Sequence, residues 1–187
     1  DLLDLSVLEH GQVVLNAQTE PLGQVLDRAV AAALAAGGAR RLTIRRDPAG
    51  ETQPVTTDTG RLAQVFINLI SNAAKYCDGA VPRLEIIARH GPETIEIDFI
   101  DNGAGIPSAS QVLIFEKFAR LDDNTAVSAP GGAGLGLAIC REIMDRLGGS
   151  IVYLPDQDGA AFRITLPRRP PETFLGSAGV AAGANAF

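Results

Sequence analysis

Four polar side chains recur at helical spacing in the stretch from residue 64 to residue 77. They are Asn68, Asn72, Lys75 and Tyr76, and they occupy one narrow arc of the predicted helix. The adjoining arc is apolar and is expected to pack on a core. Polar groups beside a core are costly unless something satisfies them, so this arc is a candidate wall of a binding site. A solvated helix face is the alternative interpretation.

A second candidate group lies where a predicted strand ends, at Asp101. Gly103 and Gly105 in the following turn allow positive φ values or a close approach of the backbone to a ligand. A carboxylate held at a strand end can accept a hydrogen bond from an exocyclic amine, such as that of adenine. An ordinary Asp-Asn-Gly turn is the alternative interpretation.

A third group is the glycine cluster at 131–137, Gly-Gly-Ala-Gly-Leu-Gly-Leu, which opens directly into a predicted helix. Backbone amides at a helix N-terminus form an anion site that suits phosphates. The cluster matches neither the P-loop nor the dinucleotide-binding fingerprint. It is also compatible with a flexible hinge of a lid.

Between the two glycine clusters, the spacing of Phe115 and Phe118 predicts that both rings are core residues on a short helix near 109–118. These rings would dock the base of the loop at 121–134, whose length is typical of a lid. Arg120, at the entry to this loop, could reach phosphates.

The remaining patterns predict the elements that position these residues. Helices are expected at 1–10, 21–36, 59–77 and 135–147, and Asp58 or Thr59 is the predicted N-cap of the third. Strand character is found at 13–15, 40–46, 55–57, 83–90, 94–101, 150–154 and 160–166. Alternation in 83–90 and 94–101 indicates an antiparallel hairpin with one face on a core. The Pro-, Gly- and Ala-rich sequence beyond Pro167 is typical of a tail.

Composition limits the class of protein. The 187 residues are 46% hydrophobic and 20% charged, which suits one globular domain of about 150 residues with appendages. The net charge of −6 and the lack of a basic patch argue against nucleic acid as a partner. No run of about 18 apolar residues and no signal-peptide pattern is present, so a soluble fragment without direct membrane contact is expected.

The thiol and imidazole groups do not indicate a metal centre. Cys77 and Cys140 lie far apart in predicted helices and are expected to be reduced thiols of a cytoplasmic protein. His10 and His90 do not have the spacing of metal ligands, so a zinc site is not expected.

Four motifs in a fixed order resemble those of the catalytic ATP-binding domain of sensor histidine kinases, within the gyrase, chaperone, histidine kinase and mismatch-repair ATPase superfamily. They are the asparagine box at 68–76, the first glycine box at 101–105, the phenylalanine box at 115–118 and the second glycine box at 132–136. The expected fold is an α/β two-layer sandwich of the Bergerat type, with a mixed, mainly antiparallel sheet and helices on one face.

The resemblance also divides the chain into three parts. Residues 1–11 are similar to the end of the dimerisation and phosphoacceptor hairpin, 12–167 to the catalytic ATP-binding domain, and 168–187 form the tail.

Particular roles follow from the resemblance. Asp101 would bind the adenine amine, and Asn72 would coordinate Mg²⁺ with support from Asn68. Lys75 would neutralise phosphate charge, and Tyr76 would lie against the nucleotide. The implied ATP-binding residues are Asn68, Asn72, Lys75, Tyr76, Asp101, Gly103, Gly105, Ile106, Phe118, Arg120, Gly132, Gly134, Leu135, Gly136 and Leu137.

Position 68 separates branches of the superfamily. Members that hydrolyse ATP carry a glutamate at this place, which activates water. Asn68 cannot take a proton near neutral pH, so a general base is missing and no catalytic residue is assigned. Binding of ATP-Mg²⁺ without such a base suits transfer of the γ-phosphoryl group to a protein side chain.

Three departures from the kinase pattern stand out. A phosphoacceptor motif is absent, and neither His10 nor His90 has the sequence context to replace it. The loop at 121–130 contains no Lys or Arg, and Ala133 occupies a place where many kinases have Thr or Ser.

The expected function is therefore that of a histidine kinase domain. It would donate the γ-phosphoryl group to a histidine outside this sequence, for relay to a response regulator. Expected partners are its own dimerisation and phosphoacceptor domain, in a homodimer, and the receiver domain of that regulator. An anti-sigma-type protein-serine kinase and a non-catalytic nucleotide-binding or interaction domain are the alternatives. The helix-like segment at 1–11 favours the histidine kinase.

Overall fold

The computed structural model describes residues 15–37, 41–78, 80–117, 134–155 and 157–171. The helix predicted at 1–10 and nearly all of the predicted tail lie outside these residues. So do three of the predicted binding residues, Phe118, Arg120 and Gly132.

Five strands form the main sheet, in the order β2-β4-β5-β7-β6. Strand β2 pairs with β4 in parallel, and the other three pairs are antiparallel. The predicted mixed, mainly antiparallel sheet is confirmed. The strands are β2 (Thr43–Arg46), β4 (Arg83–His90), β5 (Thr94–Asp101), β6 (Ser150–Tyr153) and β7 (Ala161–Pro167).

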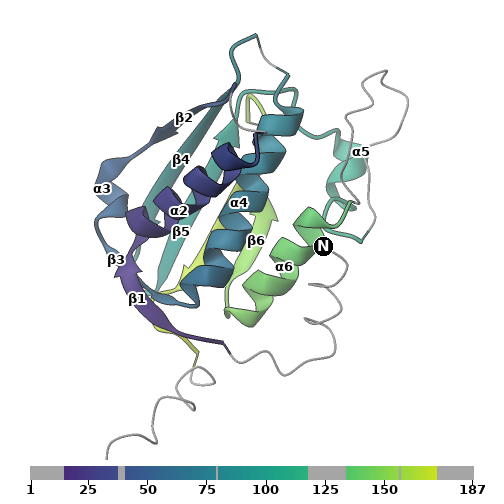
Figure 1. Cartoon of the computed structure of the whole chain (residues 1–187). Coiled ribbons are helices and arrows are strands. Elements are labelled where there is room, and N and C mark those ends of the chain that lie inside the picture. The colour runs from purple at the N-terminus through teal and green to yellow at the C-terminus, as the bar shows by residue number, and fades with distance from the viewer. Residues whose placement is uncertain (1–14, 38–40, 79, 118–133, 156, 172–187) are drawn as a thin grey trace, which may run out of the picture.

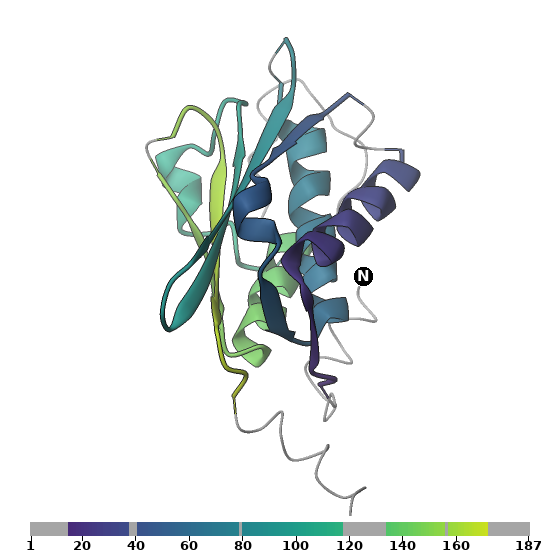
Figure 2. The same ribbon diagram turned by 90° about the vertical axis from the view of Figure 1, so that its left-hand side faces the viewer.

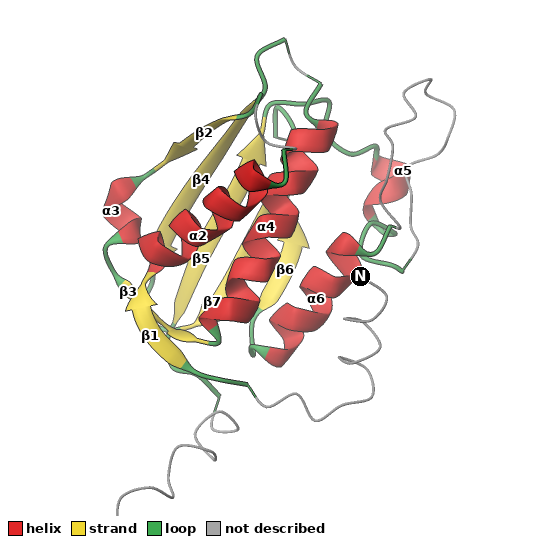
Figure 3. Cartoon of the chain, viewed as in Figure 1, coloured by secondary structure: helices red, strands yellow, loops and turns green. Residues whose placement is uncertain are grey.

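Three longer helices cover one face of this sheet, so the two-layer sandwich is also confirmed (Figures 1, 2 and 3). They are α2 (Leu22–Ala35), α4 (Thr59–Tyr76) and α6 (Gly136–Arg146). One continuous hydrophobic core lies between the two layers. Within the described residues, no helix is both long and apolar enough to cross a membrane.

Helix α4 lies centrally on the sheet, and local chemistry explains where it begins. Asp58, one of the two predicted candidates, is its N-cap, and the Asp58 carboxylate accepts a hydrogen bond from the backbone N–H of Arg61 at 3.0 Å. Phe66 on the apolar face of the helix packs on Phe99 of β5, with 5.3 Å between ring centroids. This contact positions the asparagine helix relative to the strand that ends in Asp101.

Two short elements differ from the expectations. Strand β1 is Gln18–Pro21 and pairs with β3 (Pro54–Thr57) as a separate antiparallel ribbon, whereas Leu15, for which strand character was predicted, lies outside any strand. Helix α3 (Pro48–Glu51) was not predicted. It begins because the Asp47 side chain accepts a hydrogen bond from the backbone N–H of Ala49 at 3.0 Å, and Pro48 suits a first helical position.

The helix expected near 109–118 is wrong in length, because α5 is only Ser108–Gln111. Tight turns follow, in which Leu113 donates to the carbonyl of Ser110 and Glu116 to that of Leu113. Val112 and Leu113 are 81% and 55% exposed, so a longer helix would not bury an apolar stripe here.

The face of the sheet away from the helices carries an ionic cluster around Asp98. This side chain is 5% exposed and accepts hydrogen bonds from Arg163 of β7, at 2.8 and 3.0 Å, and from Arg89 of β4. Burial raises the pKa of the Asp98 carboxyl, but the two guanidinium groups outweigh it and hold this pKa below its usual range.

The Asp98 cluster gives a first prediction. The pKa of the Asp98 carboxyl is lower in the folded than in the unfolded protein. The ionised carboxylate therefore contributes its full stabilisation above the unfolded pKa of about 3.9, and this stabilisation is lost as the pH falls through the folded pKa. We expect Asp98→Asn to lower the free energy of unfolding by about 1–3 kcal/mol at pH 7, measured by urea unfolding, with a smaller difference below pH 4. Glu96→Gln is the matched control, because its ion pairs with the same arginines are 3.6 Å long and its side chain is 36% exposed. Equal losses from both variants would contradict this assignment.

Candidate nucleotide-binding site

Asp101 lies at the end of β5 and continues the alternation of Ile95, Ile97 and Phe99, which face the helices. It is half-buried, and its Oδ1 atom accepts two backbone hydrogen bonds, from Gly103 and from Ala160, each 2.9 Å long. Within the described part of the chain, no hydrogen bond engages its Oδ2 atom. Asp101 therefore presents one satisfied oxygen and one that remains available to a ligand.

Burial and hydrogen bonding have opposite effects on the pKa of the Asp101 carboxyl. Burial raises the pKa of the Asp101 carboxyl above its usual range, and the nearby Asp78 acts in the same direction. The hydrogen bonds from Gly103 and Ala160 act against this rise because they stabilise the charged form.

The first glycine box packs directly on the end of α4. A Cβ atom at Gly103 would lie 3.1 Å from Cys77 Cα and 3.4 Å from the carbonyl oxygen of Tyr76. A side chain at this position would push the box away from the helix. Gly105 has φ of 73°, a left-handed conformation that favours glycine. The structure thus brings the polar end of α4 and the predicted adenine site together.

Asn102 stabilises the junction between the first glycine box and the end of α4. Its Oδ1 atom accepts hydrogen bonds from the backbone N–H of Arg83 at 2.7 Å and from the Cys77 thiol at 3.0 Å. Its Nδ2 atom donates to the carbonyl of Val81 at 3.1 Å. One carboxamide therefore links the glycine box to the end of α4 and to the start of β4.

Asn68 lies against the helix that follows the second glycine box. A Cβ atom at Gly136, the first residue of α6, would lie 3.7 Å from Asn68 Oδ1. Burial raises the pKa of the Cys140 thiol to about 12, and a hydrogen bond with Asn68 acts against that rise. The asparagine box and the N-terminus of α6 therefore meet in the structure, as the predicted site requires.

The start of α6 is the predicted anion site. Leu135 caps the helix without a side-chain hydrogen bond, and Gly134 has φ of 67°. Leu135 itself is 4% exposed and belongs to the core, so its backbone, not its side chain, faces any ligand. Free amides at a helix N-terminus can hold phosphate oxygens.

The other predicted residues of the asparagine helix differ in exposure. Asn72 is half-buried, and no hydrogen bond to its amide exists within the described residues. Lys75 and Tyr76 are exposed at the end of the helix, and Tyr76 retains 58% of its surface. Tyr76 therefore contributes little to the core and is available to cover a ligand.

Three aromatic side chains, each in contact with the next, connect the phenylalanine box to the first glycine box. Phe115 and Phe162 lie edge to face with 6.3 Å between centroids, and Tyr153 packs on Phe162 at 5.6 Å. The Tyr153 hydroxyl accepts a hydrogen bond from the backbone N–H of Ile106 at 3.2 Å. Phe115 is half-buried and packs against the core, which confirms its predicted packing role.

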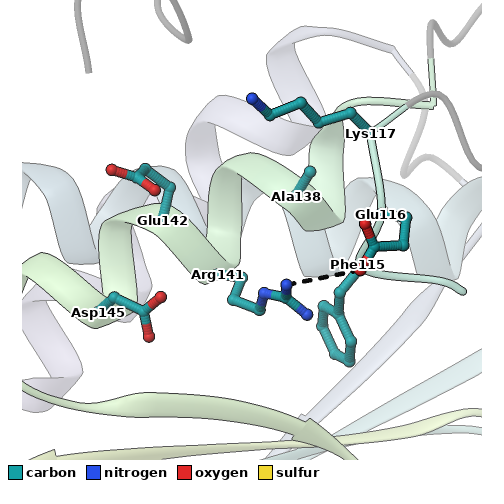
Figure 4. Close-up of a pocket in the computed structure, with 7 residues that line it drawn as sticks. All are labelled: Phe115, Glu116, Lys117, Ala138, Arg141, Glu142 and Asp145. Atoms are coloured by element: carbon teal, nitrogen blue, oxygen red, sulfur yellow. Dashed lines mark ion pairs between the residues drawn. The ribbon is translucent and has the colours of Figure 1, made fainter. Parts of the chain in front are cut away.

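A pocket lies on the outer side of α6, beside the segment that follows α5 (Figure 4). The Arg141 guanidinium lies 6.0 Å from the Phe115 ring centroid and 3.6 Å from the Glu116 carboxylate. None of the predicted nucleotide-binding residues lines this pocket. Its lining residues are Phe115, Glu116, Lys117, Ala138, Arg141, Glu142 and Asp145.

The sequence analysis missed several residues that build this site. Gly159 and Ala160, from the turn between β6 and β7, contact Asp101 across 58 and 59 positions of the chain, and Tyr153 accepts a hydrogen bond from Ile106, next to the first glycine box. Asn102 was predicted within that box, but its hydrogen bonds to Cys77 and Arg83 were not. The Asp-Gly pair at 158–159 indicated a turn, but a local turn pattern does not indicate which distant strand end the turn will contact.

The fold and this arrangement of Asp101, two glycine boxes and an asparagine helix define a nucleotide-binding domain of the ATPase type. Residues 57–170 match the family described as histidine kinase-, DNA gyrase B-, and HSP90-like ATPases. The chain belongs to this family, and the resemblance found in the sequence is confirmed.

Relatives and solved structures agree with this assignment. The chain is 45% identical over 107 residues to sensor protein KdpD of Escherichia coli. The aligned region makes up 57% of this chain and 12% of KdpD. It is 34% identical over 175 residues to the signal transduction histidine-protein kinase/phosphatase MprB of Mycobacterium sp. strain KMS, covering 91% of this chain and 32% of MprB. The chain thus spans less than half the length of these relatives.

The fold recurs in the catalytic domain of histidine kinase ThkA. The TM-score is 0.68 at 23% identity, over 83% of this chain and 99% of that one.

The Asn102 junction gives the second prediction. We expect Asn102→Ala to lower the free energy of unfolding by about 0.5–1.5 kcal/mol, because the exposed backbone groups of Arg83 and Val81 lose their side-chain partner. Asn102→Asp is the matched control: it keeps the accepting oxygen for Arg83 but loses the donor to Val81, so a smaller loss is expected. Thermal and urea unfolding measure both variants, and unchanged stability of Asn102→Ala would show that the junction is not needed.

Proposed function

We propose that this chain is the catalytic domain of a sensor histidine kinase, which binds ATP with Mg²⁺ and presents the γ-phosphoryl group to a histidine outside the chain. The observation that carries the proposal is the meeting of three parts: a carboxylate at the end of β5, the asparagine face of α4 and the N-terminus of α6. The names of the relatives, sensor proteins and a histidine-protein kinase, support the kinase class.

The base would bind at Asp101. Its Oδ2 atom is the acceptor that faces a ligand, since the backbone N–H groups of Gly103 and Ala160 occupy Oδ1. The six-amino group of adenine donates to such an oxygen. Ile106 and Gly105, braced by Tyr153, would lie beside the base, with Tyr76 covering it.

The side chains of α4 fit a magnesium site. Mg²⁺ takes oxygen ligands and is usually held by one or two protein groups together with substrate phosphates and waters. The amide of Asn72 is half-buried and makes no hydrogen bond within the described residues, so its oxygen can serve as such a ligand, with Asn68 in support. An ion held there would neutralise phosphate charge.

The phosphate end would lie at the start of α6. Backbone amides from Gly134 to Leu137 can donate to phosphate oxygens, and the helix dipole favours negative charge there. Lys75 would add a cation from α4. Local positive groups are needed because the whole chain carries a net charge of −6.

The residue at position 68 favours transfer over hydrolysis. A carboxamide cannot abstract a proton from water near neutral pH, so Asn68 can position the metal and the phosphates but cannot act as a general base. Catalysis would then come from alignment of the γ-phosphoryl group with its acceptor and from charge neutralisation.

The acceptor and the partners are proposed on the same basis. The γ-phosphoryl group would pass to a histidine of the dimerisation and phosphoacceptor domain, in a homodimer, and then to an aspartate of a response regulator. The domain would work in the cytoplasm.

Restoring the acceptor provides the direct test of this function. In a longer chain that includes the proposed acceptor hairpin, γ-labelled ATP should give a phosphoprotein that is labile in acid and stable in alkali. Acid-stable phosphate would instead support a protein-serine kinase. If ATP bound without any transfer, the domain would be a nucleotide-binding module, and the kinase proposal would fail.

The magnesium assignment gives a further prediction. We expect Asn72→Ala to remove most of the difference in ATP affinity between Mg²⁺ and EDTA, whereas the wild-type chain should bind ATP about tenfold or more tightly with Mg²⁺. Isothermal titration calorimetry measures both affinities. Ser71→Ala, one position earlier on α4, is the matched control and should keep the metal dependence. If ATP affinity still depended on Mg²⁺ in Asn72→Ala, Asn72 would not be the magnesium ligand.

A further inference from the structure

We propose that Asp58 is a positioning residue for phosphoryl transfer. Its carboxylate joins the entry segment, residues 15–21, to the first turn of the asparagine helix α4 and so fixes the direction from which the chain enters the domain. This inference rests on the proposed transfer to an acceptor upstream of the entry segment. It concerns the end of α4 opposite to Lys75 and Tyr76.

Both oxygens of the Asp58 carboxylate accept a hydrogen bond. Oδ1 accepts from the backbone N–H of Arg61, in the first turn of α4, and Oδ2 accepts from the backbone N–H of Asn16, each at 3.0 Å. The second bond spans 42 positions of the chain. A helix cap needs only one acceptor, so the bond to Asn16 has a separate effect. It holds the entry segment on α4.

Neighbouring contacts hold the entry segment in the same place, beside the start of α4 (Figure 1). Leu15 and Ala17, on either side of Asn16, pack against the hydrophobic core. Thr59, the first residue of α4, is 1% exposed, and its hydroxyl donates a hydrogen bond to Gln18 Oε1 at 3.1 Å. The entry segment is therefore fixed to the first turn of α4 over several residues.

Strand β1, the second part of the entry segment, is held by two further elements. It pairs with β3, whose last residue, Thr57, directly precedes Asp58. Glu20 of β1 also accepts two hydrogen bonds from Arg28 of α2, at 2.6 and 2.7 Å. We therefore expect the entry segment, β3 and the starts of α2 and α4 to move as one body.

Helix α4 connects this junction to the proposed metal site. At a rise of 1.5 Å per residue, Asn72 lies about 20 Å along the helix axis from Asp58. A change in the angle between the entry segment and α4 would therefore turn the whole ATP site relative to an acceptor upstream. Phosphoryl transfer needs its reacting atoms in line, and a misplacement of about 1 Å can cost about 100-fold in rate. The bond from Asp58 to Asn16 limits this angle.

Two substitutions remove this bond from opposite sides. Asp58→Asn keeps a good N-cap, but its single oxygen should stay with the more buried N–H of Arg61, so the bond to Asn16 is lost. Asn16→Pro removes the N–H itself and leaves Asp58 intact. Thr19→Val is the matched control. It removes another exposed hydrogen bond of the entry segment, 2.9 Å long to the Thr56 hydroxyl, which does not involve α4.

Three measurements on each variant and on the double variant test the inference. Calorimetry gives the ATP affinity of the 187-residue chain. Labelling with γ-labelled ATP gives the rate of transfer in a longer chain that includes the proposed acceptor hairpin. The same assay gives the rate when the 187-residue chain acts on that hairpin supplied as a separate chain. Circular dichroism and thermal unfolding confirm that each variant is folded. A positioning role changes only the second measurement, because a separate hairpin does not use the entry segment.

The expected loss is confined to transfer within the longer chain. Asp58→Asn and Asn16→Pro should each lower that rate by about three- to tenfold, while ATP affinity and labelling of the separate hairpin stay within about twofold of wild type. The double variant should lose no more than either single variant, because all of them lack the same hydrogen bond. Thr19→Val should transfer at the rate of the wild type.

Different failures have different meanings. If the wild-type chain bound no ATP or labelled no hairpin, the proposed function would be wrong, and the inference with it. If the wild type transferred, three results would show that Asp58 only caps α4 and would overturn the inference alone: an unchanged rate within the longer chain, an equal loss in all three measurements, or a loss no larger than that of Thr19→Val. Should Asp58→Asn not fold, Asp58→Ser gives the same decision, because its hydroxyl can cap the helix but is too short to reach both N–H groups.

Discussion

The packing of Phe66 on Phe99 is the contact on which the site depends. It joins the middle of α4 to β5, 5.3 Å between centroids, and both rings are nearly fully buried. Because side chains alternate along a strand, the helix-facing position two residues after Phe99 is Asp101. Because a helix repeats every 3.6 residues, burial of Phe66 turns Asn68 and Asn72 to the flank of the core. One apolar contact thus aligns a carboxylate and two carboxamides that are far apart in the sequence.

Close backbone approach then completes the end of the site at which we propose that the base binds. Gly103 approaches the end of α4 so closely that a Cβ atom would force its neighbours apart, and Gly159 lies nearer to Asp101 than a Cβ atom allows. The donors that hold Asp101 are backbone groups, so their positions depend on the strands and turns and little on neighbouring side chains. The proposed metal end is different, because it would rely on the side chains of Asn68 and Asn72. Backbone groups therefore hold the proposed base end in place, whereas the proposed phosphate end would respond to changes of single side chains of α4.

Much of this arrangement could be predicted from the sequence, because its main elements carry strong patterns. The hairpin of β4 and β5 and the capped helix α4 have clear periodicity and were placed within a residue or two of their ends. Strand β3 was also placed within a residue, but β1 and its pairing with β3 were not predicted, since strands of four residues are specified mainly by the partner they find. The helix at 109–118 was overestimated, because helical spacing of Phe115 and Phe118 was taken for a continuous helix. The contact between Gly159 and Asp101 could not be predicted at all, as it depends on the register of β5 with β7.

That register explains why the β6–β7 turn belongs to the site. Strand β7 pairs with β5 so that Ala161 lies opposite Ile100, which places Ala160 beside Asp101. A shift by one residue would turn Phe162 and Ile164 out of the core, so burial of these side chains holds the register. By fixing the strands, the hydrophobic core therefore determines which backbone N–H meets the Asp101 carboxylate. The Asp101 carboxylate, which we propose binds the base, is oriented in this way without any additional polar side chain.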